Sequence, residues 1–172
     1  MPLPEPELFE QIGRLCSSWS LLETLSEATI WGLLKVKPNV GEAITGRMDM
    51  RGRWQLLLDT AKNIHNDTDM ACLKGFDRDI KVLNQDRNVV VHGVMSAIIN
   101  EEQNAYELGP AWSVQRGGNA GKRYPVSTEA VTIIRENIRT TGDKLAEFNG
   151  RFGYAIQSFP LGEVVKGWPL RL

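Results

Sequence analysis

The sequence has few of the residues that build metal sites and disulfide frameworks. Among 172 residues there are two cysteines, Cys16 and Cys72, and two histidines, His65 and His92. The cysteines are far apart and lie in helix-like patterns, and no Cys/His spacing matches a zinc site. Residues 100–104, NEEQN, also lack the alternating oxygen ligands and the glycine of an EF-hand. We therefore expect reduced thiols, no metal and no cofactor.

Long apolar runs and an excess of positive charge are missing as well. No window approaches the length of a membrane span. The first residues, MPLPEPELFEQ, have neither the basic start nor the apolar run of a secretory signal. These features and the reduced thiols predict a cytoplasmic protein without a membrane anchor. The formal net charge of -1 argues against nonspecific phosphate binding over a whole face, so any nucleic-acid site must be local.

Apolar residues recur at spacings of three and four through most of the chain, which predicts a mainly α protein. The helical segments are residues 5–36, residues 48–64, a segment capped by Asp69 that runs to about residue 92, and a segment that starts at Ser127 or Thr128 and continues past Gly150. The first is long enough to be one helix or two, with a break at Gly13 or at residues 17–18, and Pro38 and Gly41 end it. We expect an antiparallel helical bundle of four to five helices, in a single domain over residues 1–172.

The period changes at residues 94–116, where two apolar-rich runs flank polar turn residues and predict a small β-hairpin insertion. A glycine-rich basic loop follows, so that the hairpin and loop together cover about residues 94–124. Its GGNAGK is not a phosphate-binding P-loop, because Arg116 stands where the first glycine belongs and Arg123 where Ser or Thr would hold magnesium. We interpret the loop as a surface loop whose Arg116, Lys122 and Arg123 are candidates for contact with RNA.

The most specific stretch is QDRNVVVHG at residues 85–93, in which Arg87 precedes His92 by five positions. Five residues turn an ideal helix by about 140 degrees, so Arg87 and His92 do not share a face, whereas Asn88 and His92 do. A distorted last turn or a second copy of the motif across a dimer interface would bring them together. The β-branched valines between them favour burial over helix formation.

An ordinary interpretation of this stretch is also available. Arg87 would pair with a carboxylate such as Asp86 or Glu23, and His92 would favour a helix end because of the helix dipole. The same dipole argument makes His65, near the end of the second long helical segment, a capping or surface residue. A plain helical structural protein would then account for the tryptophans as core and leave the spacing of Arg87 and His92 without a role.

The stretch RNVVVH resembles the signature of the HEPN superfamily, the higher eukaryotes and prokaryotes nucleotide-binding domains. Arg87 fits the family's arginine, Asn88 the polar residue that follows it, and His92 the histidine. The segment WSLLETLSEA, residues 19–28, is similar to the first helix of such domains, with Trp19 and Glu23 facing the motif helix. The order of the predicted helices resembles that of the family over roughly residues 8–155. The specific part of the resemblance is the six residues RNVVVH.

The resemblance implies a metal-independent endoribonuclease that leaves 2',3'-cyclic phosphate ends. His92 would transfer protons, Arg87 would bind the phosphoryl group, and Asn88 would orient the imidazole or bond a phosphate oxygen. Glu23 and Asp86 are supporting candidates, with Glu23 holding Arg87 in place. RNA is the implied substrate, and a homodimer would bring two motifs into one cleft.

Members of this family serve as toxins or antiviral defence effectors, so an antitoxin is an implied partner. The alternative is a catalytically inactive binding or scaffold module that works with a nucleotidyltransferase or another protein. The AMP-accepting tyrosine of modified relatives is missing here, because Gly93 follows His92 and Tyr106 is the nearest tyrosine. In either case residues 94–124 offer an RNA contact or a partner surface.

Overall fold

A computed structural model describes residues 6–92, 94–96, 111–113, 123–125 and 127–154, and for the three short central segments it describes the backbone. The helices are α1 (Pro6–Leu34), α2 (Pro38–Thr45), α3 (Met50–Ala61), α4 (Asp67–His92) and α5 (Thr128–Phe152), and the strands are β1 (Val94–Ser96), β2 (Ala111–Ser113) and β3 (Arg123–Pro125). The five helices pack together into a helical bundle, which confirms the mainly helical prediction.

Side-chain oxygens cap the helix starts that the sequence predicts. Ser127 accepts a hydrogen bond from the backbone N–H of Ala130, and Asp49 accepts one from that of Gly52. The amide oxygen of Asn66 likewise accepts from the backbone N–H of Asp69 at 2.9 Å. α4 therefore begins slightly earlier than the cap predicted at Asp69, because Asn66 satisfies one of the free backbone donors of the first turn.

α1 is one continuous helix, and α2 is an element that the sequence prediction missed. Pro38 was interpreted as a helix terminator, yet it occupies the first turn of α2, where its missing N–H costs nothing. A Cβ at Gly41 would come within 2.5 Å of the Trp31 ring. Glycine is therefore required there because α2 lies directly against α1, and the Trp31 indole N–H donates to Thr45 Oγ1 at 3.1 Å.

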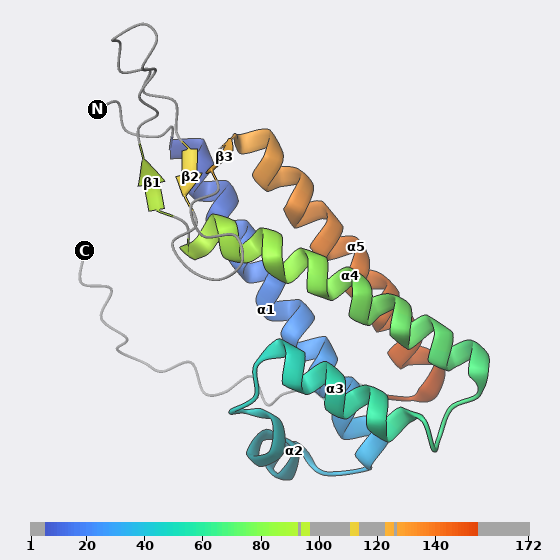
Figure 1. Ribbon diagram of the computed structural model, residues 1–172. Coiled ribbons are helices and arrows are strands. Elements are labelled where there is room, and N and C mark those ends of the chain that lie inside the picture. Colours follow the sequence, from blue (N-terminus) through green and yellow to red (C-terminus); the bar gives the residue numbers. More distant parts are fainter. Residues whose placement is uncertain (1–5, 93, 97–110, 114–122, 126, 155–172) are drawn as a thin grey trace, which may run out of the picture.

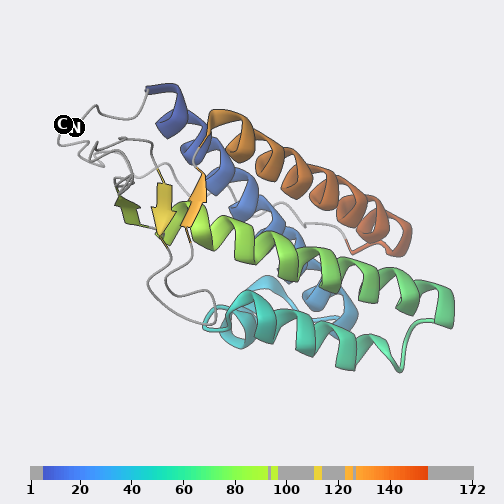
Figure 2. The same ribbon diagram turned by 45° about the horizontal axis from the view of Figure 1, so that its top comes forward.

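The long helices do not all alternate in direction, which corrects the prediction of an antiparallel bundle. α1 and α5 lie side by side and run the same way, whereas α4 runs opposite to both (Figures 1 and 2). Polar contacts follow this alignment: Arg135 of α5 donates to Gln11 near the start of α1, and Asn149 near the end of α5 donates to the Leu25 carbonyl. The parallel pair places the C-terminal part of α4 across the N-terminal half of α1.

The core is formed along the shared faces of α1, α3, α4 and α5. Trp19, Trp54 and Ile138 are among the largest fully or almost fully buried side chains. The Trp54 indole N–H donates to Ser26 Oγ at 3.2 Å and satisfies a polar atom that would be costly to bury unpaired. Phe9 and Ile64 belong to the apolar periodic pattern of their segments, yet both are 52% exposed. Apolar periodicity therefore predicts that a segment is helical more reliably than it predicts how deeply each residue is buried.

The strands connect the end of α4 to the start of α5. β1 pairs antiparallel with β2, which pairs antiparallel with β3, in the order β1-β2-β3. The turn predicted at residues 100–104 lies outside the described residues. β3 falls within the segment that the sequence predicts as a loop, and its Arg123 pairs in register with Ser113.

Two isoleucines of α5 form a matched test of the core. Ile138 is 0% exposed, whereas Ile133 on the same helix is 54% exposed. We expect Ile138→Ala to lower the free energy of unfolding by roughly 2–5 kcal/mol, because it removes buried methylene contacts and leaves a cavity. Ile133→Ala should change it by less than about 0.5 kcal/mol. Urea unfolding followed by circular dichroism measures both, and equal losses would contradict this packing.

Candidate functional site

The candidate site lies at the C-terminal end of α4, which continues as a regular helix through the three valines and ends at His92. Val90 is buried, and Val89 and Val91 pack against the core while partly exposed. This burial compensates for the weak helix propensity of β-branched residues. The valines therefore anchor the last turn, and His92 is exposed at its end.

Arg87 and His92 contact each other within one chain. Arg87 Nη1 lies 3.3 Å from His92 Nε2. The side chains start on different faces of α4, but the long arginine side chain spans the difference without a distorted helix. Because a guanidinium donates only, His92 Nε2 is the acceptor in this contact, and the proton of a neutral imidazole is then on Nδ1. In this arrangement Nε2 carries no proton, and its single lone pair accepts from Arg87.

Two further side chains hold Arg87 in this position. Arg87 Nη1 also donates to Asn88 Oδ1 at 2.9 Å. The guanidinium carbon lies 5.6 Å from the centre of the Trp19 ring, where the negative face of the aromatic system attracts a cation. Trp19 comes from the middle of α1 and is only 2% exposed, so it forms a rigid support. The expectation that Trp19 faces the motif helix is confirmed.

One donor of Arg87 is left without a partner. Nε of Arg87 is buried and has no hydrogen-bond acceptor among the described residues. An unpaired buried donor costs about 1–3 kcal/mol, and such groups in a folded protein often mark a site that a ligand or water completes. The guanidinium of Arg87 is thus held in place by the contacts of Nη1, while the donor on Nε is unsatisfied.

The two supporting carboxylates form no ion pair with Arg87 among the described residues. Glu23 Oε1 is 4.0 Å from Arg53 Nη1 in α3, and the closer contact of Arg53 is with Glu27, at 3.1 Å. Asp86 is exposed on α4. Within the described residues neither Glu23 nor Asp86 forms an ion pair with Arg87, so a salt bridge does not explain the position of the arginine.

The three candidate RNA-contact residues are described in part or not at all. Arg116 and Lys122 lie outside the described residues. Arg123 begins β3, and the structure describes its backbone pairing alone. The site as described therefore consists of Arg87, Asn88 and His92 on α4 with Trp19 on α1.

The prediction that His65 is a surface or helix-capping residue is wrong, because its side chain is buried. Its side chain is 3% exposed, its Nδ1 lies 3.7 Å from Asp69 Oδ2, and its Nε2 lies 3.0 Å from the Tyr154 hydroxyl. The rings of Phe148 and Phe152 pack against it. The spacing of His65 and Asp69 was a visible signal, but the aromatic partners are more than eighty residues away in the sequence.

No metal centre or membrane span is apparent in the described part of the chain. No group of three or more histidine, cysteine or carboxylate side chains is placed to hold a metal ion there. No described helix is both long enough and apolar enough to cross a bilayer.

Comparison of the chain with protein-family models, with curated proteins and with solved structures gives no match. The resemblance to the HEPN signature consequently depends on the motif residues themselves. What the structure adds is the local geometry of Arg87, Asn88, His92 and Trp19.

Asp86 provides a pH-dependent test of the site's surroundings. Although Asp86 is an exposed residue, partial loss of hydration at its carboxyl raises the pKa of this group, so the folded chain binds its proton more readily than the unfolded chain does. Stability from this group is then present below the unfolded pKa and is lost as pH rises through the folded pKa. Asp86→Asn should be more stable than the wild type at pH 7, with the difference shrinking at pH 3. Urea midpoints at both pH values measure this, and a variant that is less stable at pH 7 would contradict it.

Proposed function

We propose that the chain is a metal-independent endoribonuclease of the HEPN type. The observation that supports this best is the contact of Arg87 with His92, which puts a permanent cation beside an unprotonated imidazole nitrogen at an exposed helix end. Cleavage of RNA at its own 2'-hydroxyl needs these two functions. A base removes the hydroxyl proton, and a cation stabilises the charge that grows on the phosphoryl oxygens.

His92 Nε2 is the atom that accepts the proton, after the incoming phosphate has drawn Arg87 Nη1 away from its single lone pair. The 2'-oxygen then attacks the adjacent phosphorus, a new O–P bond closes the five-membered ring, and the bond to the 5'-oxygen breaks. The leaving oxygen takes up a proton, which leaves a 2',3'-cyclic phosphate on one fragment and a 5'-hydroxyl on the other. Every atom of this reaction comes from the RNA, so its balance requires no further co-reactant.

Arg87 is the phosphate-binding group. Its Nη1 is engaged by Asn88 and His92, and its Nε is buried and unpaired among the described residues, so a phosphate would bond the guanidinium through Nη2. Trp19 and Asn88 hold the guanidinium so that little side-chain freedom is lost when a phosphate binds. Asn88 acts here as a positioning residue through its Oδ1, and its amide N–H groups remain as donors for a phosphate oxygen.

A symmetric dimer completes the proposal. One protomer offers one imidazole at the end of α4, whereas the reaction needs a base for the 2'-hydroxyl and an acid for the leaving oxygen. Two copies of the α4 terminus in one groove would supply both, and two copies of Arg87 would concentrate positive charge on a chain whose formal net charge is -1. A cytoplasmic RNA is the proposed substrate, in a defence or toxin role with an antitoxin partner.

The test is cleavage of a mixed RNA pool in EDTA by the purified chain. We expect wild-type cleavage with 2',3'-cyclic phosphate ends, and losses of at least about 100-fold for His92→Ala and for Arg87→Ala, since general acid–base catalysis contributes 10²–10⁴-fold. Arg78→Ala is the matched control, because Arg78 is exposed on the same helix. It should cleave at close to the wild-type rate.

Two outcomes would overturn the proposal. The first is a folded, dimeric wild type that does not cut RNA, which would favour an inactive binding module. The second is cutting that survives in both His92→Ala and Arg87→Ala, which would assign the activity to other residues or to a contaminant. Circular dichroism spectra of all variants separate loss of activity from loss of fold.

A further inference from the structure

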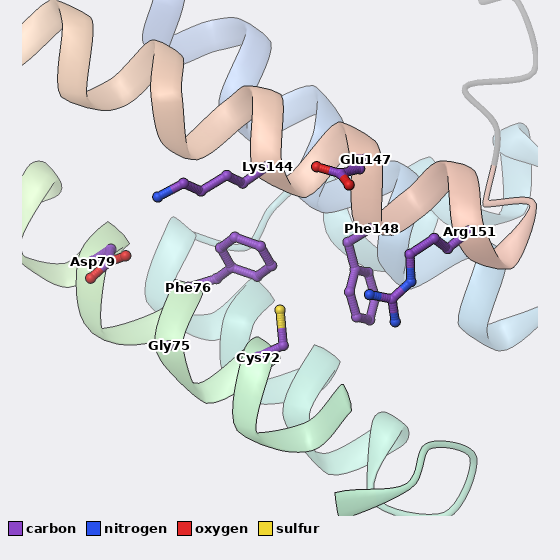
Figure 3. Close-up of a pocket in the computed structure, with 8 residues that line it drawn as sticks. All are labelled: Cys72, Gly75, Phe76, Asp79, Lys144, Glu147, Phe148 and Arg151. Atoms are coloured by element: carbon purple, nitrogen blue, oxygen red, sulfur yellow. The ribbon is translucent and has the colours of Figure 1, made fainter. Parts of the chain in front are cut away.

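A second candidate site lies in a groove between α4 and α5, far from His92. The groove has a volume of about 320 Å³ and is lined by side chains of both helices (Figure 3). Its α4 residues, from Cys72 to Asp79, lie twenty to thirteen positions before His92, which is about 30 to 20 Å along a helix. The groove is therefore independent of the proposed ribonuclease site, and each can exist without the other.

The floor of the groove is aromatic. Phe76 of α4 and Phe148 of α5 contribute rings whose centroids are 6.2 Å apart at an interplanar angle of 83°. Gly75 leaves room beside them, since a Cβ at this position would have no atom within 4 Å. A volume near 300 Å³ is at the lower end for small-molecule sites, which fits a fused ring system with one substituent.

One end of the groove carries a fixed cation. Arg151 Nη2 pairs with Asp69 Oδ1 at 2.6 Å, and its guanidinium lies 5.5 Å from the centre of the Phe148 ring and 5.1 Å from that of Phe152. Figure 3 shows the guanidinium beside Phe148 at the edge of the groove. Among the described residues Nη2 is the nitrogen with an ion-pair partner, so the other donors of the fork are available to a ligand.

The other end carries charges of both signs. Lys144 of α5 and Asp79 of α4 lie there, and no ion pair joins them in the described part of the chain (Figure 3). Glu147 also lines the groove, so the rim has no excess of positive charge. All three side chains are exposed, but the guanidinium of Arg151 is held by Asp69 and two phenyl rings, whereas Lys144 and Glu147 form no ion pair within the described part of the chain.

We propose that this groove binds a small planar aromatic anion. The ring system would stack on one of the Phe76 and Phe148 rings and meet the edge of the other, beside Gly75. A carboxylate or phosphate on the ring would accept hydrogen bonds from the free edge of Arg151. Asp79 and Lys144 would then bond polar atoms at the far edge of the ring. A carboxylate and a phosphate are both anions that accept hydrogen bonds from a guanidinium, so a ligand with either acid group fits the proposal.

Cys72 provides a reporter for the test, because its exposed thiol lines the groove and its sulfur points between the two phenyl rings (Figure 3). Alkylation of Cys72 by iodoacetamide would be followed by mass spectrometry of its peptide, with 2-naphthoate, 2-naphthyl phosphate or the uncharged 2-naphthamide present. We expect the anions to protect Cys72 saturably. The amide should need at least about tenfold more ligand for the same protection, which corresponds to the loss of roughly 1.4 kcal/mol.

Three variants make the test specific. Gly75→Leu should abolish protection by filling the groove, and the fold tolerates it because space is open at this Cβ and leucine is a good helix former. In Arg151→Gln, 2-naphthoate and 2-naphthamide should protect Cys72 equally weakly. Arg139→Gln, an exposed arginine of the same helix outside the groove, should protect like the wild type.

The results that would overturn the proposal follow from the same experiment. Equal protection by 2-naphthoate and 2-naphthamide in the wild type would exclude recognition of an anion. Protection that persists in Gly75→Leu would place the ligand elsewhere, and no protection by any of the three compounds would exclude the site. Protection by one anion alone identifies whether the carboxylate or the phosphate is the preferred acid group.

Discussion

The contact of Trp19 with Arg87 connects the core to the candidate site. Trp19 belongs to the buried face of α1, so its position is fixed by the same packing that holds α1 against α4 and α5. Its ring lies beneath the guanidinium of Arg87, which in turn reaches His92. A close-packed core transmits small displacements, and any change that shifts α1 relative to α4 would therefore alter the arginine and the imidazole together.

The parallel alignment of α1 and α5 determines where the two polar clusters lie. With α4 antiparallel to both, the C-terminal end of α4 meets the first half of α1, and its N-terminal end meets the last turns of α5. Arg87 and His92 lie at one end of α4, and Asp69 with Arg151 and His65 at the other. The two clusters differ in exposure. His92 is exposed and the Nε donor of Arg87 lacks an acceptor among the described residues, whereas the His65 side chain is almost fully buried.

Much of the fold was predictable because helix periodicity and capping are local signals. The cap at Ser127, the long first helix and the helical motif segment follow from residues close together in sequence. α2 was missed because proline is common both just after the end of a helix and in the first turn of a helix. The residue type alone does not distinguish the two positions. The relative directions of α1 and α5 depend on contacts between residues more than a hundred positions apart, and no local pattern encodes them.

The candidate site was predictable in its residues but not in its contacts. The motif identified Arg87, Asn88 and His92, and the similarity of the first helix identified Trp19. Glu23 lies 4.0 Å from Arg53 of α3, and sequence spacing cannot decide which arginine a carboxylate approaches. The burial of His65 depends on rings contributed by the distant end of α5. In each case the deciding partner comes from another helix.

The central claim is that Arg87 and His92 act as one chemical unit, and a double-mutant cycle on metal-free RNA cleavage tests it most directly. The rates of the wild type, Arg87→Ala, His92→Ala and the double variant are compared under the same conditions. Residues that act as a unit give strongly non-additive losses, so the double variant should lose about as much activity as the worse single variant. Losses that multiply in the double variant would contradict the account, because they would mean that the two side chains contribute independently.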